Sequence, residues 1–323
     1  MRARRVVITD QSFPGLAHEE RAAARAGAEL VVRSDVTAEA EVVKLTAGAD
    51  VVMLAYAEIT DRVLAGLAEG ATVIRYGIGY ETIDVEAAAR HGVRVCNVPD
   101  YGADTVADHT VMLALAVLRR VADYHARITA SESGWVSATD LGPIAAVSDV
   151  TYGLVGTGQI GRKVAARVRA FGAEVIAYDP YADAEAVAAE GITLTDFDTL
   201  LECADIVSVH APLTPETRHL IDARAMAAMK DSAILVNTAR GALVDTRAAA
   251  EAVSAGRLGG LGLDVLESEP LEEGHPLRTA PRTLLTPHAA FYSERSLTNL
   301  QRFAAEEMER ALRGEPLRCQ LRR

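Results

Sequence analysis

Three polar residues of complementary chemistry each follow an apolar run in the last third of the chain. The segments AILVNTARG, LGLDVLESEP and LLTPHAAFYSE supply Arg240, Glu269 and His288 in that order. An arginine binds a planar carboxylate through two parallel hydrogen bonds. A histidine can give a proton to a carbonyl oxygen near neutral pH, and a nearby carboxylate orients and stabilises its charged form. Together these residue types predict the reversible reduction of a 2-oxo acid.

Each of these residues also has an ordinary structural explanation when it is taken alone. Arg240 could form a surface ion pair, Glu269 could belong to a solvated acidic turn, and His288 could be a hydrogen-bonded structural histidine. Residues that follow parallel strands, however, converge on one crevice at the carboxyl edge of the sheet. Their joint occurrence therefore favours a catalytic site.

A glycine-rich stretch, GLVGTGQIG, indicates how such a site would hold a cofactor. Gly156, Gly158 and Gly161 fit the G-x-G-x-x-G spacing, and they lie where a predicted strand ends and a helix begins. The helix N-terminus offers amide donors to a pyrophosphate, and the glycines permit a tight turn, a close approach and close packing. Without its context, this spacing is equally typical of a plain strand-to-helix turn.

Asp179 supplies that context, because it ends the next predicted strand eighteen residues after Gly161. A carboxylate at this place accepts hydrogen bonds from a ribose and repels a 2′-phosphate, so we expect NAD rather than NADP. The alternative is a turn residue preceding Pro180.

The elements that position these residues form the same pattern twice along the chain. Short β-branched runs alternate with Ala/Glu/Arg-rich helical segments, which indicates parallel sheets covered on both faces. Expected strands are 5–9, 29–33, 50–54, 72–76 and 93–98 in the first unit, and 151–155, 174–178, 206–210, 233–237, 261–265 and 283–286 in the second. One long helix is expected over 104–127, and a helix over 293–312 has no strand after it.

We therefore predict an α/β fold of two doubly wound parallel-sheet domains with a cleft between them. A flavodoxin-like substrate domain comprises residues 1–102 plus 291–323, since the last helix is expected to pack back on the first unit. A Rossmann NAD-binding domain comprises residues 103–290.

Composition narrows the class of partners. The net charge of -12 disfavours direct binding to nucleic acid or an anionic membrane surface. Cys96, Cys203 and Cys319 are far apart with no Cys-x-x-Cys pair, so we expect reduced thiols and no metal site. The longest apolar run, 111–118, is too short to span a membrane. These features predict a soluble cytoplasmic protein.

At the segments VCNVPDYGADTVADHT, GLVGTGQIG, NTARG, LDVLESEP and TPHAA the chain resembles the D-isomer-specific 2-hydroxyacid dehydrogenases. The resemblance covers nearly the whole length. It implies an oxidoreductase in which Arg240 binds and polarises the substrate, Glu269 pairs with the histidine, and His288 is the acid and base.

The resemblance also implies two sets of binding residues. The NAD set is Thr105, Gly156, Gly158, Gln159, Ile160, Gly161, Asp179, His210, Ala211, Pro212, Thr217, Thr238, Ala239 and Asp264. The substrate set comes from RYGIGYETID and the segment after the histidine, and comprises Arg75, Tyr76, Gly77, Ile78, Gly79 and Phe291.

Within the family, the chain looks most like the branch that contains the C-terminal-binding-protein corepressors. Arg75 matches that branch, whereas Phe291 stands where the corepressors carry tryptophan, and Glu269 departs from the glutamine of the formate dehydrogenases. Two functions follow: an NAD-dependent D-2-hydroxyacid dehydrogenase, or an NAD(H)-sensing corepressor-like binding protein with weak dehydrogenase activity. A homodimer is expected, in which the apolar face of 104–127 contributes to the contact or instead packs inside its own domain.

Overall fold

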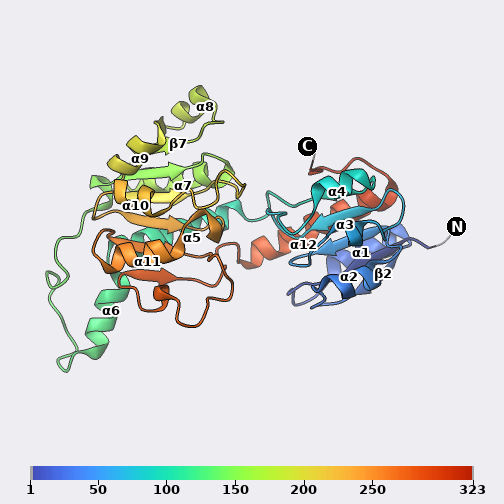
Figure 1. Ribbon diagram of the computed structural model, residues 1–323, viewed down its shortest axis with the longest axis horizontal. Helices are drawn as coiled ribbons and strands as arrows, with labels where there is room; N and C mark the ends of the chain where they lie inside the picture. The colour runs from blue at the N-terminus through green and yellow to red at the C-terminus, as the bar shows by residue number, and fades with distance from the viewer. Residues whose placement is uncertain (1–2, 322–323) are drawn as a thin grey trace. The chain divides into compact units, whose positions relative to one another are not determined.

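A computed structural model describes residues 3–321 of the chain (Figure 1). The chain divides into two compact units: unit 1 runs to Gly102 and resumes at Tyr292, and unit 2 is Ala103–Phe291. Residues 1–2 and 322–323, which belong to the predicted substrate domain, lie outside the described residues. Each unit is an α/β layer structure with its own parallel sheet, as the sequence pattern predicted.

The sheet of unit 1 has five parallel strands in the flavodoxin-like order β2-β1-β3-β4-β5. Its inner strands are almost wholly apolar because helices cover both faces of a parallel sheet. The strands are β1 (Arg5–Ile8), β2 (Glu29–Val32), β3 (Val51–Leu54), β4 (Thr72–Arg75) and β5 (Arg94–Cys96). The helices are α1 (Ala17–Ala26), α2 (Glu39–Thr46), α3 (Asp61–Leu64), α4 (Val85–Arg90) and α12 (Glu294–Arg313).

Helix α12 belongs to unit 1 although it comes last in the sequence. It begins at a capping box in which Ser293 and Ser296 satisfy each other's backbone amides, and it ends at Gly314, whose φ of 71° is left-handed. Its buried face packs against α1 and against strands β3 and β4. The C-terminal segment thus completes the first core.

The sheet of unit 2 has seven parallel strands in the order β12-β11-β10-β9-β6-β7-β8. The order reverses between β6 and β9, so the switch point of this Rossmann-type sheet lies there. The strands are β6 (Thr151–Val155), β7 (Glu174–Tyr178), β8 (Thr193–Leu194), β9 (Ile206–Val209), β10 (Ile234–Asn237), β11 (Gly260–Leu263) and β12 (Thr283–Leu285). Strand β8, only two residues long, was not predicted.

The helices of unit 2 cover both faces of this sheet. They are α5 (Ala103–Leu118), α6 (Val121–Ala130), α7 (Gln159–Ala170), α8 (Ala184–Ala189), α9 (Phe197–Cys203), α10 (Ala223–Ala228) and α11 (Thr246–Ser254), with short 3-10 turns η1 (Val147–Asp149), η2 (Gly241–Leu243) and η3 (Pro276–Arg278).

The prediction of one continuous helix over 104–127 is wrong. The helix breaks at Arg120, whose φ of 54° is left-handed and whose side chain binds Asp123 and the carbonyl of Leu141. Helix α5 packs on α7, β10 and β11, whereas α6 buries no residue. The apolar face of α5 is therefore core of its own unit, which was the alternative to a dimer contact.

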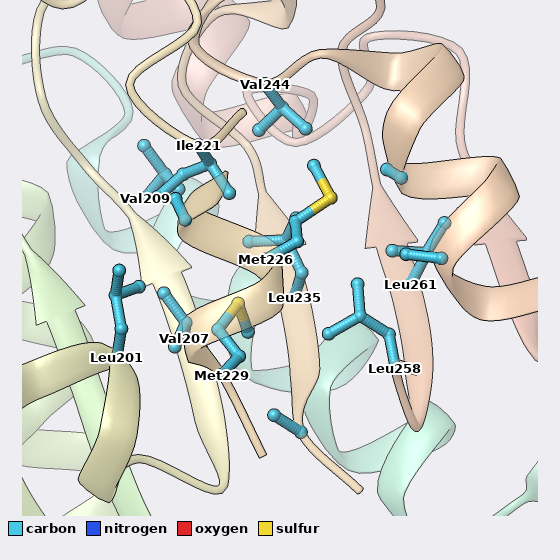
Figure 2. Packing of buried hydrophobic residues seen from close by; sticks show 14 of the residues in the cluster. Leu201, Val207, Val209, Ile221, Met226, Met229, Leu235, Val244, Leu258 and Leu261 are labelled. Carbon is cyan, nitrogen blue, oxygen red and sulfur yellow. The ribbon is translucent and has the colours of Figure 1, made fainter. Parts of the chain in front are cut away.

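Strands β9, β10 and β11 are held by a shared apolar core against α10 and α11. Figure 2 shows Val207 beside Met229, Leu235 beside Met226, and Leu261 near Leu258. Full burial of a side chain of this size contributes about 1.5–3 kcal/mol. The strand ends that carry Arg240 and Asp264 thus project from a rigid layer.

Residues 3–321 contain neither a membrane-spanning helix nor a cluster of metal-binding side chains. No described helix is long and apolar enough to cross a membrane. No group of three or more His, Cys, Asp or Glu side chains in this part of the chain is placed to hold a metal ion.

Candidate active site

Each glycine of the loop between β6 and α7 meets a different steric requirement. Gly156 has φ 103°, and a Cβ there would lie 3.0 Å from the carbonyl of His210. A Cβ on Gly161 would lie 2.3 Å from the carbonyl oxygen of Gly156, so α7 sits directly on the loop. A Cβ on Gly158 would meet nothing within 4 Å. The open side of the loop therefore lies at Gly158, beside Gln159 and Ile160 at the N-terminus of α7.

Asp179, directly after β7, ties this loop to the neighbouring strand. Its carboxylate accepts hydrogen bonds from the Thr157 amide at 2.8 Å, the Thr157 hydroxyl at 2.7 Å and the Tyr181 amide at 3.0 Å. Burial opposes ionisation of Asp179, but these hydrogen bonds and the charge of Arg162 outweigh it and lower its pKa. The carboxylate is thus ionised and fixed at the edge of the loop.

The segment after β9 closes the other side of the switch point. His210 is half-buried with Nε2 2.8 Å from the Ser208 hydroxyl, and desolvation lowers its pKa to about 4, so the imidazole is neutral. Ala211 and Pro212 follow. The Thr217 hydroxyl donates to the Pro212 carbonyl and accepts from the Thr214 amide, each at 2.7 Å. Thr217 therefore shapes this loop.

The turn after β10 places Arg240 and is folded by a buried side chain. Asn237 donates from Nδ2 to the Arg240 carbonyl at 2.8 Å and accepts from the Ala239 amide at 3.0 Å. Thr238 hydrogen-bonds through its hydroxyl to Thr110 of α5 at 2.7 Å. A Cβ on Gly241 would lie 1.9 Å from the Leu266 carbonyl oxygen, so the Arg240 segment rests on the backbone of the following loop.

The loop after β11 brings Glu269 to His288. One carboxylate oxygen of Glu269 accepts from the Leu266 amide at 3.0 Å, and the other lies 2.8 Å from Nδ1 of His288. Burial opposes ionisation, but the His288 and Leu266 hydrogen bonds and the charge of Arg240 lower the pKa of Glu269. An ionised Glu269 therefore faces one ring nitrogen, and Nε2 lies on the opposite edge of the imidazole.

Asp264 anchors the segment that carries His288. Its side chain is 1% exposed, and the carboxylate accepts from the Ala289 and Ala290 amides at 2.8 and 2.9 Å. The Asp264 carbonyl accepts from the His288 amide at 2.8 Å. His288 has a left-handed φ of 52°, a conformation that costs about 1 kcal/mol or more outside glycine. Asp264 holds that conformation, and its predicted place near the nicotinamide stays a prediction.

The predicted substrate-binding segment 75–79 lies in unit 1. Arg75 donates to the Tyr76 carbonyl at 2.6 Å and folds over Gly77, whose φ is 132°. A Cβ on Gly77 would meet the Arg75 guanidinium at 1.6 Å, so a side chain at 77 would displace it. Asn97 donates to the Ile78 carbonyl at 2.7 Å. The segment is thus a tight, glycine-dependent turn at the end of β4.

The remaining predicted residues fall on unit 2. The Phe291 ring lies 6.4 Å from the His288 ring, edge to face at 80°, and Thr105 lies in the first turn of α5. Unit 2 therefore carries the glycine loop, and it brings Glu269 to His288 with the charge of Arg240 near enough to lower the pKa of Glu269.

Several residues that build this site were not predicted. Asn237 and Thr157 could have been noticed, since both are polar and lie inside motifs that were recognised, NTARG and GLVGTGQIG. Glu267, in contrast, binds the Thr246 amide and hydroxyl at 3.0 and 2.6 Å and His219 at 2.5 Å. No local signal points to those partners, which lie 21 and 48 residues away.

Comparison with known proteins gives one consistent result. Residues 111–290 match the NAD binding domain of the D-isomer specific 2-hydroxyacid dehydrogenases. A D-3-phosphoglycerate dehydrogenase of Mycobacterium leprae is 40% identical over 268 residues, which cover 83% of this chain and 50% of that protein. A glyoxylate reductase of Thermofilum pendens is 38% identical over 265 residues, which cover 80% of this chain and 77% of that protein.

The fold of the chain also matches that of a protein of known structure. A crystal structure of a Thermus thermophilus protein aligns with a TM-score of 0.88 and 34% identity, over 98% of this chain and 100% of that chain. The chain spans about half the length of the phosphoglycerate dehydrogenases that it matches. With a matching NAD-binding domain, relatives along most of its length and the same fold, the chain belongs to the D-isomer-specific 2-hydroxyacid dehydrogenase family, as its motifs predicted.

Proposed function

We propose that this chain is an NAD-dependent dehydrogenase that interconverts a small 2-oxo acid and the corresponding D-2-hydroxy acid. The observation that carries the proposal is the contact of 2.8 Å between Glu269 and Nδ1 of His288, beside the Arg240 turn on the cofactor-binding unit. The glyoxylate reductase and phosphoglycerate dehydrogenase names of its relatives support this substrate class.

The residues around the glycine loop fit a dinucleotide. Gly158 leaves an open approach to the amides at the start of α7, and the ionised Asp179 offers acceptors for ribose hydroxyls. A like charge at Asp179 disfavours a 2′-phosphate, so the proposal specifies NAD. When bound, the reduced nicotinamide supplies the hydride for the reaction.

His288 is assigned the role of general acid in reduction and general base in oxidation. Glu269 accepts a hydrogen bond from the Nδ1–H group, which leaves Nε2 to give its proton to the carbonyl oxygen of a 2-oxo acid and to take it back in the reverse direction. The ionised Glu269 also stabilises the charged imidazole before transfer. His288 thus transfers the proton, and Glu269 orients the imidazole and stabilises its charged form.

Arg240 and the residues around it are assigned to substrate binding. Its guanidinium binds the carboxylate and polarises the adjacent carbonyl of the 2-oxo acid. The Phe291 ring, edge-on to His288, is assigned to the substrate side chain. In unit 1, the turn 75–79 is assigned to the substrate carboxylate through its backbone amides.

The test combines a substrate screen with one substitution. NADH oxidation is followed with glyoxylate, pyruvate, hydroxypyruvate and branched, aromatic and phosphonate-bearing 2-oxo acids. Arg240→Gln should nearly abolish turnover of the acid found and leave NADH binding intact. Arg247→Gln removes an arginine of the same unit that pairs with Glu272 at the surface, and it serves as the control. Turnover of no acid by the wild type, or full turnover by the Arg240 variant, would reject the proposal.

We also propose that the chain forms a homodimer through α6 and the segment that follows it. Helix α6 buries no residue, Val121 is 55% exposed, and Trp135 is 74% exposed. Helix α6 projects from unit 2 (Figure 1), and large exposed apolar side chains on such a segment are typical of a protein interface. A second copy of this chain would cover them.

A further inference from the structure

His109, a residue outside the proposed catalytic set, lies against the anchor of the His288 segment. It is on α5, and its side chain is 18% exposed. Its Nε2 atom is 3.0 Å from the Thr286 hydroxyl and 3.5 Å from the Asp264 carboxylate. The Thr286 hydroxyl in turn lies 2.5 Å from the same oxygen of Asp264. The three side chains form a continuous polar chain from α5 to the end of β12.

The number of available protons fixes the direction of the hydrogen bonds among these three side chains. A carboxylate only accepts hydrogen bonds, so the single hydroxyl proton of Thr286 is donated to Asp264. The Thr286 oxygen then has only lone pairs to offer, and the 3.0 Å contact requires that Nε2 of His109 carry a proton. Donation therefore runs from His109 to Thr286 and from Thr286 to Asp264.

Asp264, the last acceptor in this series of hydrogen bonds, controls the backbone around His288. The Asp264 carboxylate also accepts the Ala289 and Ala290 amides, and the Asp264 carbonyl accepts the His288 amide. A rotation of the carboxylate would break its contacts with the backbone that follows His288. Because His288 is held in a left-handed conformation, it depends on these contacts for its orientation.

We propose that His109 is a positioning residue for the catalytic histidine. By donating through Thr286, it fixes the rotation of the Asp264 carboxylate and thereby the direction in which the His288 imidazole meets Glu269. This inference rests on the proposed dehydrogenase function for its kinetic consequence only. Its structural consequence, the orientation of His288, is measurable without any substrate.

Two pairs of variants separate hydrogen bonding from packing. His109→Phe keeps a ring and removes the donor, whereas His109→Gln keeps an N–H donor at a similar reach. Thr286→Val and Thr286→Ser form the second pair, which gives the same test if the His109→Phe protein does not fold. His91→Phe changes a histidine of unit 1 that pairs with Asp61 and serves as the control.

The first readout is the NMR signals of the His288 ring, assigned by their absence in a His288→Gln protein. The second is kcat and KM for the 2-oxo acid that the wild type reduces, together with NADH affinity. His109→Phe and Thr286→Val should shift the His288 signals and lower kcat about 10- to 100-fold, the effect of a misplaced reacting group, with KM and NADH affinity little changed. His109→Gln and Thr286→Ser should recover most of both.

Unchanged His288 signals in His109→Phe and Thr286→Val would overturn the proposal. So would a His109→Gln protein as impaired as His109→Phe, because the hydrogen bond would then not be the cause. If the wild type reduces no 2-oxo acid, the proposed function fails by itself, and the NMR comparison still decides the role of His109.

Discussion

Two glycines of the same motif should fail in different ways when each is replaced by alanine. At Gly161 the new Cβ would lie 2.3 Å from the Gly156 carbonyl oxygen, whereas real Cβ atoms stay beyond 3.0 Å. The helix and the loop must therefore separate by at least about 0.7 Å. At Gly158 the new Cβ meets nothing within 4 Å, and the φ of -65° suits alanine.

The magnitudes follow from these geometries. Because the new Cβ meets a backbone oxygen, the cost of overpacking lies in the upper part of its usual range, at about 2–3 kcal/mol, and alanine regains about 1 kcal/mol inside a helix, so Gly161→Ala should lose about 1–2 kcal/mol. For a unit of this size that lowers the melting temperature by about 2–8 °C. Gly158→Ala at the helix N-cap should lose less than about 1 kcal/mol. Its methyl group, however, occupies the approach proposed for the pyrophosphate, so NADH affinity should fall at least about tenfold.

Thermal unfolding with and without NADH, together with an NADH fluorescence titration, measures both effects. The wild type should gain stability with NADH by mass action. Gly158→Ala should melt near the wild-type temperature without NADH and gain little from it, and Gly161→Ala should melt lower from the start. Gly15→Ala, at an open position of unit 1, is the control. Tight NADH binding by Gly158→Ala, or wild-type melting of Gly161→Ala, would refute this account of the loop.

Three further variants have expected outcomes. Glu269→Gln removes the negative charge that lies 2.8 Å from Nδ1 of His288, so reduction should slow about 10- to 100-fold at neutral pH; an unchanged rate of reduction would contradict the pairing. The lowered pKa of Asp179 gives stability that is present above its usual value of 3.8 and lost as pH falls through the folded-state value, so Asp179→Asn should melt lower than wild type at pH 7 and differ less at pH 3. The same variant should bind NADPH more nearly as well as NADH, and equal discrimination in both proteins would count against the ribose assignment. Trp135→Ala should weaken the proposed dimer in light scattering over a dilution series, and a wild type that is monomeric throughout would refute the dimer.

Local patterns were sufficient to predict every strand of the two sheets except β8, the glycine turn between β6 and α7, and the polar residues that follow the strand ends. Each depends on a few adjacent residues, as in the separate geometric tasks of Gly156, Gly158 and Gly161. The break between α5 and α6 could not be predicted in this way, because apolar residues continue at helical spacing through Val121. The left-handed Arg120 is held partly by the carbonyl of Leu141, 21 residues further along the chain.

The acidic stretch after β11 shows why composition alone could not assign its members. Asp264, Glu267 and Glu269 lie within six residues, and as a pattern they indicate only an acidic turn. In the structure each has different partners: Asp264 holds the His288 segment, Glu267 binds Thr246 and His219, and Glu269 faces His288.

The three carboxylates hold different parts of the candidate site. Burial opposes the ionisation of Glu267, but hydrogen bonds from Thr246 and His219 lower its pKa, so it stays charged as an anchor. The backbone that it fixes is the one on which Gly241 rests and from which Glu269 extends. Arg240 and Glu269 are therefore placed by a common support, and His288 by a separate one at Asp264. Two supports, at Glu267 and at Asp264, therefore converge on the 2.8 Å contact between Glu269 and His288, and both depend on partners more than twenty residues away in the sequence.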